Sequence, residues 1–359
     1  MYVVLRKTHG IVACLLATVL FCATGAYAAW RVDCLHPTGS ARSCAWAVSG
    51  SEQVGTVGNH AACWNSTTQT WTDLNPAGSG TSSEARGAYG GKQVGKYNAA
   101  HGDRACLWQG SAESVVTLHP STASNSQAYG IWGNVQVGSA SVGGTHVASM
   151  WRGTAASWVN LQPGGAMSSD AYGAFGEQQY GLVHYFGNDQ GGYWTGSAGS
   201  WVSLNPTGCM YASVRDGDGS RYVGYAQLGS RDRAMLWLGS ANDYVDLTPG
   251  VNVSGHAFAM CGDYQVGNAF INLKDHAGIW MGTAESWFDL QNLLPAEYTS
   301  SSAYGVDIVG GNLVVVGQAW NNVLQRSEAM MWSQPVPEPS CFVALAAGLA
   351  SLGLLRRRR

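Results

Sequence analysis

Two small groups of residues have the types and spacing that bind ligands in proteins. The first is Asp216, Asp218 and Ser220, which place three side-chain oxygens at alternate positions of one segment. Such a run can begin a calcium-binding loop, because Ca²⁺ takes about six to eight oxygen ligands. No acidic residue follows in Arg221 to Gly224 to close the loop, and Asp and Gly suit a tight turn equally well. Apart from this calcium hypothesis, the sequence indicates no cofactor.

The second group is Trp132 and Trp320, which are the two tryptophans that the repeat described below leaves unexplained. Trp132 is flanked by Gly130 and Gly133, and Trp320 lies in a predicted loop. Loop aromatics are better candidates for ligand binding than core aromatics. The sequence therefore nominates this pair as a ligand-binding site, with packing inside the loops as the alternative.

The sequence shows no catalytic constellation. Gly-x-Ser-x-Gly, His-Glu-x-x-His and a phosphate-binding loop are all missing from it. Paired carboxylates for glycoside cleavage could still converge from distant segments. We therefore expect a non-enzymatic protein and keep a polysaccharide hydrolase or lyase as an alternative.

Six cysteines lie outside the two ends of the chain. An oxidising compartment would favour disulfides among them, but six cysteines allow 15 pairings and the sequence does not choose one. The alternative is that they are buried small apolar residues. The six candidates are Cys34, Cys44, Cys63, Cys106, Cys209 and Cys261.

The composition favours short strands joined by glycine turns. The chain of 359 residues has 48 Gly, 15 Trp, 16 Tyr and only 11% charged residues. Low charge with many aromatics argues against a disordered chain, and so much glycine argues against a helical bundle. The sequence has no basic stretch outside its termini that would suggest nucleic-acid binding.

A repeat of about 43 residues organises the middle of the chain, and a tryptophan marks each unit. Each unit has four short apolar pieces: Ala-aromatic, Gln-Val-Gly, a piece that ends on the periodic tryptophan, and Trp-x-Asp-Leu-x-Pro. Four strands in such a period are typical of one propeller blade. The periodic tryptophans are Trp64, Trp108, Trp151, Trp194, Trp237, Trp280 and Trp332.

Seven units predict an all-β, seven-bladed β-propeller over residues 29–335. The last unit lacks its fourth piece, whereas Trp30 to Pro37 supplies a spare one at the start of the chain. Pairing the two would close the ring and remove two exposed sheet edges. An open solenoid is the alternative, and it leaves the spare piece unexplained.

Both ends of the chain have the pattern of targeting signals. Residues 1–28 have a basic start, an apolar stretch and Ala26-Tyr27-Ala28, which predicts a secretory signal peptide. Residues 336–359 contain Pro337, Glu338 and Pro339, then a short apolar stretch and four terminal arginines. The apolar stretch predicts a C-terminal hydrophobic helix in the inner membrane, with the arginines in the cytoplasm. A simple tail anchor is the alternative.

This tail resembles the PEP-CTERM sorting signal, which an exosortase reads and cleaves. The units resemble the extracellular HAF repeats, because His60 to Trp64 and His276 to Trp280 carry His-Ala-x-x-Trp with a following Asp-Leu. Together the resemblances imply an exported protein at the cell surface or outside the cell. The function we expect is a non-enzymatic matrix propeller, sorted by an exosortase and associated with exopolysaccharide or biofilm. A lectin-like carbohydrate-binding module is the alternative.

Overall fold

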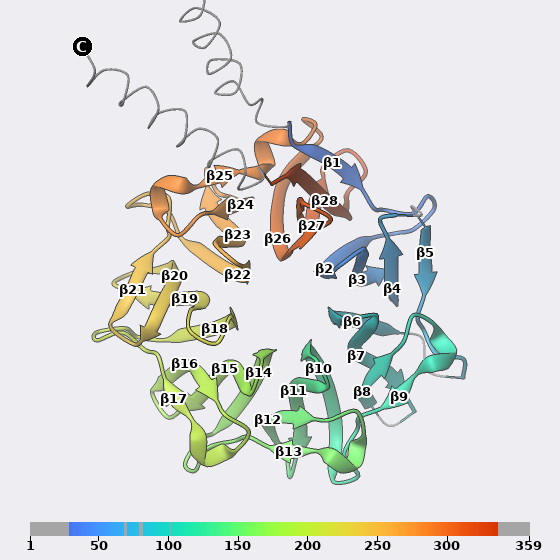
Figure 1. The fold of residues 1–359 in the computed structure, drawn as a ribbon, viewed down its shortest axis with the longest axis vertical. Coiled ribbons are helices and arrows are strands. Elements are labelled where there is room, and N and C mark those ends of the chain that lie inside the picture. The colour runs from blue at the N-terminus through green and yellow to red at the C-terminus, as the bar shows by residue number, and fades with distance from the viewer. Residues whose placement is uncertain (1–28, 68–69, 79–81, 101, 337–359) are drawn as a thin grey trace, which may run out of the picture.

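The computed structural model describes residues 29–67, 70–78, 82–100 and 102–336, which form seven four-stranded antiparallel sheets arranged in a ring (Figure 1). This confirms the predicted seven-bladed β-propeller. We call the middle of this ring, which the first strand of each blade surrounds, the channel. The predicted signal peptide (1–28) and the sorting motif Pro337, Glu338 and Pro339 lie outside the described residues and stay predictions. In the described part of the chain, no helix is long and apolar enough to cross a membrane.

Blades 1 to 4 follow the chain, each running outward from the channel. Blade 1 contains β2 (Ser43–Ser49), β3 (Glu52–Val57), β4 (His60–Asn65) and β5 (Thr70–Asp73). Blade 2 contains β6 (Ser83–Tyr89), β7 (Lys92–Ala99), β8 (Gly102–Trp108) and β9 (Val116–Thr117). Blade 3 contains β10 (Ala123–Trp132), β11 (Val135–Val142), β12 (Thr145–Trp151) and β13 (Val159–Asn160). Blade 4 contains β14 (Ser168–Phe175), β15 (Gln178–Tyr185), β16 (Asn188–Trp194) and β17 (Val202–Ser203).

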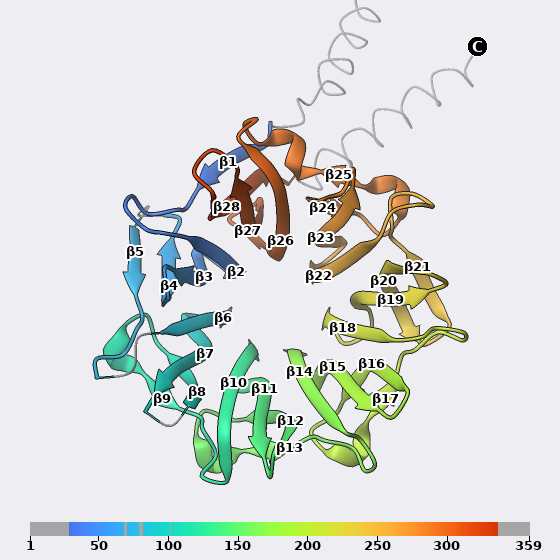
Figure 2. The same ribbon diagram turned by 180° about the vertical axis from the view of Figure 1, so that it is seen from behind.

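Blades 5 to 7 complete the ring, and the last one takes its outer strand from the start of the chain (Figure 2). Blade 5 contains β18 (Ala212–Gly217), β19 (Tyr222–Leu228), β20 (Arg231–Ser240) and β21 (Asp243–Asp246). Blade 6 contains β22 (Gly255–Cys261), β23 (Tyr264–Ile271), β24 (Lys274–Trp280) and β25 (Phe288–Asp289). Blade 7 contains β26 (Tyr298–Val309), β27 (Asn312–Asn321), β28 (Arg326–Pro335) and β1 (Arg31–Cys34).

Short 3₁₀ helices precede the fourth strand in four blades. Ser114 shows why the chain turns there: its hydroxyl donates to Ser111 O at 2.6 Å and accepts from Gln109 N at 2.8 Å. In blades 3, 4 and 6 the tryptophan that we expected to start the fourth strand instead ends this turn, as Trp158, Trp201 and Trp287 do. In blade 2 Val115 stands at that place. The helices are η1 (Ala112–Ser114), η2 (Ala155–Ser157), η3 (Ala198–Ser200) and η4 (Ala284–Ser286), with η5 (Leu290–Leu293) after β25.

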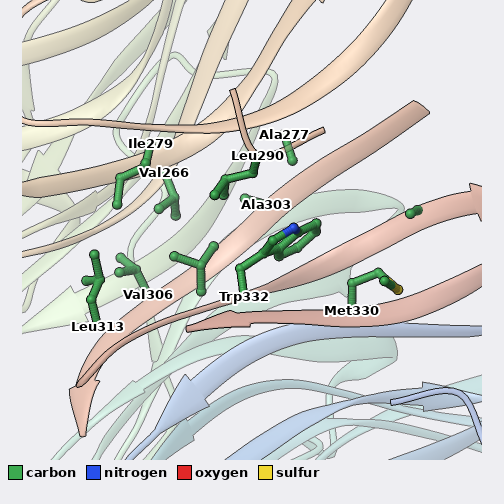
Figure 3. Close-up of a cluster of buried hydrophobic side chains, with 11 residues drawn as sticks. Val266, Ala277, Ile279, Leu290, Ala303, Val306, Leu313, Met330 and Trp332 are labelled. Carbon is green, nitrogen blue, oxygen red and sulfur yellow. The ribbon is translucent and has the colours of Figure 1, made fainter. Parts of the chain in front are cut away.

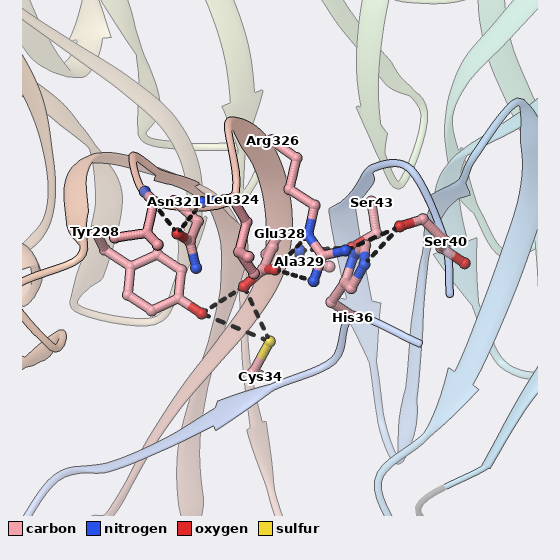
Figure 4. A network of polar contacts seen from close by, with 11 residues as sticks. Cys34, His36, Ser40, Ser43, Tyr298, Asn321, Leu324, Arg326, Glu328 and Ala329 are labelled. Atoms are coloured by element: carbon pink, nitrogen blue, oxygen red, sulfur yellow. Dashed lines mark hydrogen bonds and ion pairs between the residues drawn. The ribbon is translucent and has the colours of Figure 1, made fainter. Parts of the chain in front are cut away.

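Ring closure follows the prediction from the spare N-terminal piece. β1 pairs with β28 along its whole length, from Arg31 opposite Ser333 to Cys34 opposite Met330. A polar network reinforces the joint between blades 7 and 1 (Figure 4). In it, Glu328 accepts from Tyr298 at 2.5 Å. This joint covers the edge of β28 that would otherwise stand unpaired at the point where the ring closes.

The periodic tryptophans fill the spaces between blades. Trp332 is fully buried and belongs to a cluster with Val266 and Ile279 of blade 6 (Figure 3). The other six are at most 4% exposed. Burial of such large rings dominates the packing energy of a core. Five buried serines add a bond between neighbouring blades, because each accepts from a backbone N–H of the preceding blade, as Ser126 does from Ala105 N at 2.9 Å. The five are Ser43, Ser83, Ser126, Ser169 and Ser301.

The motif residues of the repeat have structural roles. The side chain of Gln93 accepts from Gly110 N at 2.8 Å and so fixes the turn after the periodic tryptophan. Gly95 lies so close to the neighbouring strand that a Cβ atom would stand 1.8 Å from Glu84 O. His60 bonds Asp73 across two strands at 2.7 Å. These contacts explain why the residues recur, and they account for them without a ligand.

We call one side of the ring the loop face. It carries the hairpins between the second and third strands of each blade and the loops that link one blade to the next. The opposite face carries the hairpins between the first and second strands, where β10 ends at Trp132. Both ends of the described chain, Ala29 and Val336, lie toward this opposite face, because Arg31 pairs with Ser333 at that end of the sheet.

Candidate functional site

The central channel carries a ring of large side chains. The innermost strand of each blade contains a β-bulge at an equivalent place, and the bulge residue has no partner in the ladder. Such bulges bend a strand and re-aim one side chain. The seven bulge residues, which we call the collar, are Trp46, Arg86, Tyr129, Tyr172, Arg215, Phe258 and Tyr304.

Collar residues of neighbouring blades touch one another. The ring of Tyr304 lies 5.5 Å from that of Phe258 and 4.6 Å from that of Trp46, measured between centroids. The guanidinium of Arg86 lies 4.0 Å from the Trp46 centroid. The contacts therefore run without a break across blades 6, 7, 1 and 2.

A second series of contacts covers blades 3 to 6. The rings of Tyr129 and Tyr172 are 5.5 Å apart, and the guanidinium of Arg215 lies 4.0 Å from the Tyr172 centroid. Arg215 also lies 5.4 Å from Tyr225, whose ring meets that of His256 at 4.5 Å. Aromatic faces hold a cation in this way by attraction to their negative quadrupole.

The residue that follows each collar residue in the sequence explains how the inner strands of neighbouring blades come so close. In blade 3 it is Gly130, where a Cβ atom would stand 2.6 Å from Tyr172 O of the next blade. Ala or Gly occupies this place in six blades, and Asp216 occupies it in blade 5. Small residues therefore allow adjacent collar side chains to contact across each blade boundary.

The two collar arginines differ in their charge environment. Arg86 forms an ion pair with Glu84 of its own strand at 2.9 Å. Arg215 donates one hydrogen bond to Tyr225 at 3.1 Å, and no carboxylate pairs with it among the residues that the structure describes. Its buried Nε atom has no hydrogen-bond partner there either. Arg215 is therefore a positive group in the channel with unused donors.

The other unpartnered nitrogen of the collar is also a donor. Trp46 Nε1 is buried without an acceptor in the described structure. The indole nitrogens of the seven periodic tryptophans also lack an acceptor, which makes this a general feature of the blade cores. Trp46 differs from them because it lies in the channel. A ligand that satisfied both Trp46 and Arg215 would have to supply oxygen acceptors.

The collar tyrosines are neutral hydrogen-bonding groups at ordinary pH. Burial raises the pKa of Tyr129 to about 12, and burial likewise raises the pKa of Tyr304 to about 12. Burial also raises the pKa of Tyr172, against the nearby charge of Arg215. Phenols in this state can donate to a ligand without repelling an anion.

Two cavities open on the loop face beside the channel. One has a volume of about 370 Å³ and reaches the collar, because Trp46 and Gln318 line it. The other has about 240 Å³ and lies between blades 2 and 3. They share Lys96 and Asp103, which form an ion pair at 2.7 Å. The loop face therefore gives a polar approach to the collar.

A polar chain on the channel side of blades 5 and 6 contains an Asp–His pair. Asp232 contacts His256 Nε2 at 3.0 Å and accepts from the Tyr211 hydroxyl at 2.5 Å. The hydrogen bond with His256, aided by the one from Tyr211, holds the pKa of Asp232 below its usual range despite burial. The other nitrogen of His256 faces Asn268 Oδ1 at 3.3 Å. Within the described residues, no nucleophile is bonded to this histidine.

Trp132 and Trp320 do not form one site. Trp132 ends β10 on the opposite face, between Tyr89 and Phe175 at 4.7 and 4.2 Å. Trp320 lies in β27 near the loop face, paired with Ser327. Our expectation of a loop at Trp320 is wrong, because the extra residues of this unit lengthen its strands, as β26 has 12 residues. Ligand binding by either residue stays a prediction.

The predicted calcium ligands Asp216, Asp218 and Ser220 bond to protein groups. Asp216 accepts from Gly217 N and from Met260 N of blade 6, at 2.9 and 3.0 Å. Asp218 accepts from the backbone and hydroxyl of Ser220. No group of three or more His, Cys, Asp or Glu that could hold a metal occurs in the described ranges. The segment is a hairpin turn, and the calcium hypothesis stays a sequence prediction.

The cysteines differ from the disulfide prediction, because all six are free thiols. Cys63 and Cys106 belong to one buried cluster between blades 1 and 2. Burial raises the pKa of Cys63 to about 12, so the thiol is neutral. Cys44 and Cys106 are buried, Cys34 is exposed, and Cys209 and Cys261 are half-buried.

Sequence reasoning missed the collar because it grouped residues by aromatic type. It took an Ala-aromatic pair as the first piece of every unit, which is Ala45-Trp46 in blade 1 and Ala88-Tyr89 in blade 2. The strand register instead places Ala85 and Arg86 at the position equivalent to the first of these pairs. The missed signal is a spacing. In six blades the collar residue stands nine positions before the Gly of Gln-Val-Gly or its equivalent, as Arg86 does before Gly95.

Comparison with known proteins supports the fold and no family. No family model matches the sequence, and no curated protein matches it. Similar solved structures include a puromycin hydrolase, with a TM-score of 0.56, 9% identity, and coverage of 84% of this chain and 55% of that one. Another is the Pyrococcus horikoshii acylaminoacyl peptidase, with a TM-score of 0.52, 9% identity, and coverage of 83% and 52%. The chain thus spans about half the length of these two proteins.

A third similar structure is a propeller by itself. It is the β-propeller domain of the Trilobed protease from Pyrococcus furiosus, with a TM-score of 0.54, 11% identity, and coverage of 83% of this chain and 98% of that one. That domain is described as having an open velcro topology, whereas β1 closes the ring here. At such identities these likenesses show the propeller fold alone.

These comparisons correct the function expected from the sequence. We expected an exosortase-sorted matrix propeller associated with exopolysaccharide, with a lectin or a polysaccharide hydrolase or lyase as alternatives. The similar structures are instead peptidases, a protease domain and a puromycin hydrolase. The expectation rested on the two ends of the chain and on repeat motifs, and the repeat motifs prove to be structural contacts.

Proposed function

We propose that this chain is a binding propeller that takes up a peptide segment in its central channel and holds it by a carboxylate. The observation that carries the proposal is Arg215, a guanidinium stacked on Tyr172 with no carboxylate partner in the described structure. A charged group in a partly buried site is costly unless it is paired, so a ligand that brings an anion gains from meeting it.

The remaining channel chemistry fits a peptide. Unused donors on Trp46 and Arg215 call for oxygen acceptors, which a peptide has in its carbonyls and terminal carboxylate. Aromatic rings provide flat surfaces for its side chains. The likeness to peptidase propellers supports the same ligand class, because those proteins act on peptides.

A binding role fits the collar better than a catalytic one. The collar supplies arginines, aromatic rings and neutral phenols, and none of these is a nucleophile at ordinary pH. His256 is paired with Asp232 on one side and Asn268 on the other, so both ring nitrogens are already engaged. We therefore propose a module that binds a peptide and leaves it intact.

The test is a titration of a short acetylated Gly-Ser peptide with a free C-terminal carboxylate, followed by calorimetry. The same peptide with a C-terminal amide is the matched control ligand. We expect the free acid to bind and Arg215→Gln to weaken it at least about tenfold, because a hydrogen bond to a charged group contributes about 1.5–3 kcal/mol. Arg152→Gln is the control variant, because Arg152 is solvent-exposed and pairs with Glu177 at 3.6 Å.

Equal binding of acid and amide would refute the proposal. So would an Arg215→Gln variant that folds normally and binds as the wild type does. A conservative Arg215→Lys variant should recover part of the affinity, because a lysine keeps the charge but loses the planar group that stacks on Tyr172.

A further inference from the structure

The loop face carries an uneven distribution of exposed apolar side chains. The six most exposed large hydrophobic residues in the described part of the chain all lie on its loops, led by Phe186 at 93% and Leu273 at 85%. Single exposed apolar residues are common on protein surfaces, whereas a group of them on one face indicates an interaction site. We call these six residues, together with Leu324 beside Val323, the apolar crescent: Met167, Phe186, Met210, Val251, Leu273, Val323 and Leu324.

The crescent occupies blades 4 to 7. Phe186, Leu273 and Val323 stand at tips of hairpins between second and third strands. Met167 and Met210 lie on loops between blades, each bonded by its backbone N–H to the end of a neighbouring second strand, at 2.8 and 3.1 Å. The apolar tips thus surround one half of the channel mouth.

Blades 1 to 3 present a different surface on the same face. Their hairpin tips there include Gly58-Asn59 and Gly143-Gly144, and no exposed large hydrophobic residue occurs on their described loops. The two polar cavities lie on this half, between blades 7 and 3. The mouth is therefore divided into an apolar half and a polar half.

The crescent and the unpaired arginine are close along the chain. Met210 precedes Arg215 by five residues of extended backbone, which span about 17 Å at about 3.4 Å a residue. Met210 stands on the loop face and Arg215 in the channel below it. One extended segment could therefore touch both, with about five residues between its two contacts.

We propose that the apolar crescent binds a short apolar stretch of the same peptide whose terminal carboxylate reaches Arg215. The ligand is a peptide or protein C-terminus with an apolar stretch about five residues before its free carboxylate. This inference rests on the proposed function and adds the apolar recognition and the spacing. The ends of the described part of the chain, Ala29 and Val336, lie toward the opposite face, so this part leaves the crescent open to such a ligand.

The experiment uses the full chain and acetylated Gly-Ser peptides with a free carboxylate. The parent peptide has no apolar residue, the spaced peptide carries Leu-Phe-Leu about five residues before the carboxylate, and the adjacent peptide carries it directly beside the carboxylate. A fourth peptide is the spaced one with a C-terminal amide. We expect the spaced peptide to bind about tenfold more tightly than the parent and the adjacent peptide to gain little.

The crescent variant combines Phe186→Ser, Met210→Ser and Leu273→Ser. It should lose the gain of the spaced peptide but keep the affinity for the parent peptide. The matched control combines Val202→Ser and Met281→Ser, which are also exposed but lie away from the loop face, and it should keep the gain. All three crescent sites are loop positions open to solvent, so these changes should leave the fold intact.

The outcomes separate the two proposals. If the parent acid binds and depends on Arg215 but the apolar stretch adds nothing, or adds equally at either spacing, the inference fails and the proposed function stands. If acid and amide bind alike and Arg215→Gln changes nothing, the proposed function fails. If, in that case, the crescent variant still loses binding of the spaced peptide, the crescent binds the apolar stretch without help from Arg215. That result would contradict the proposal that one peptide contacts both the crescent and Arg215.

Discussion

Asp216 should make the stability of the propeller depend on pH in a direction unusual for a carboxylate. It stands where the other six blades have Ala or Gly, between the inner strands of blades 5 and 6. Its two oxygens accept from Gly217 N and Met260 N, and no cation pairs with it in the described structure. Burial raises the pKa of Asp216 to about 6, against the effect of these two bonds.

The size of the effect follows from this shift. The pKa of Asp216 rises from 3.8 in the unfolded chain to about 6 in the folded protein. At about 1.36 kcal/mol per pKa unit, this difference changes the free energy of unfolding by about 3 kcal/mol in total. Between these values the folded protein holds a proton that the unfolded chain has released, so stability falls as pH rises. The loss should be complete above about pH 6.

The assay is urea unfolding of the wild type and Asp216→Asn at intervals from pH 4 to pH 7. The difference in unfolding free energy between the two should change by about 2 kcal/mol across this range, with the wild type losing stability, because pH 4 already lies just above the unfolded pKa. The wild type must be compared with the variant at each pH because other groups titrate in the same range. Burial lowers the pKa of His119 to about 4, so His119 makes the stability of both proteins fall toward acid pH. Subtracting one unfolding free energy from the other removes this shared contribution. Asp243→Asn, at an exposed site, is the control and should show no such trend.

A constant difference between wild type and Asp216→Asn would refute the reasoning. It would mean that Asp216 ionises in the folded protein as it does in the unfolded chain, and that water reaches the carboxylate between the blades. The reverse trend would mean that the bonds from Gly217 and Met260 outweigh burial.

Two further predictions concern the ring itself. Deleting Trp30 to Pro37 should expose edges on blade 7 and cause aggregation or a large loss of stability, which size-exclusion chromatography and thermal unfolding would detect; unchanged behaviour would contradict closure by β1. Trp237→Ala should cost about 3–5 kcal/mol in urea unfolding, because this side chain is fully buried. Trp71→Ala is its control at a side chain 39% exposed, and similar losses in both would contradict the assigned core.

The number of blades and the closing strand were predictable because both depend on buried, recurring residues. A periodic tryptophan such as Trp237 must fill the same space in every blade. Gly95 must be glycine because the neighbouring strand leaves no room for a Cβ atom. Trp30 to Pro37 could be assigned to blade 7 because an unpaired edge strand is unfavourable. Requirements of this kind leave a strong pattern in a sequence.

The collar could not be recognised in the same way, because its position in the repeat places little restriction on the type of residue. A bulge residue has no ladder partner, so Trp46, Tyr129 and Arg86 can all occupy it. Aromatic identity misled the alignment at Tyr89, which lies at the end of its strand beside Trp132. The spacing of nine residues before the following glycine marks the collar residue in six blades, and the strand register is needed to identify Tyr304 in the seventh.

Departures from the repeat therefore indicate where this molecule differs from a symmetric ring. Arg215 replaces an aromatic residue in the collar, and Asp216 beside it replaces a small one. Phe186 and Leu273 replace the glycines and polar residues found at the hairpin tips of blades 1 and 3. None of these substitutions is needed to pack a blade, and each places a charge or an exposed apolar group on a structure that is stable without it. They gather in blades 4 to 6, around one half of the channel, which is the arrangement expected if one asymmetric ligand enters there.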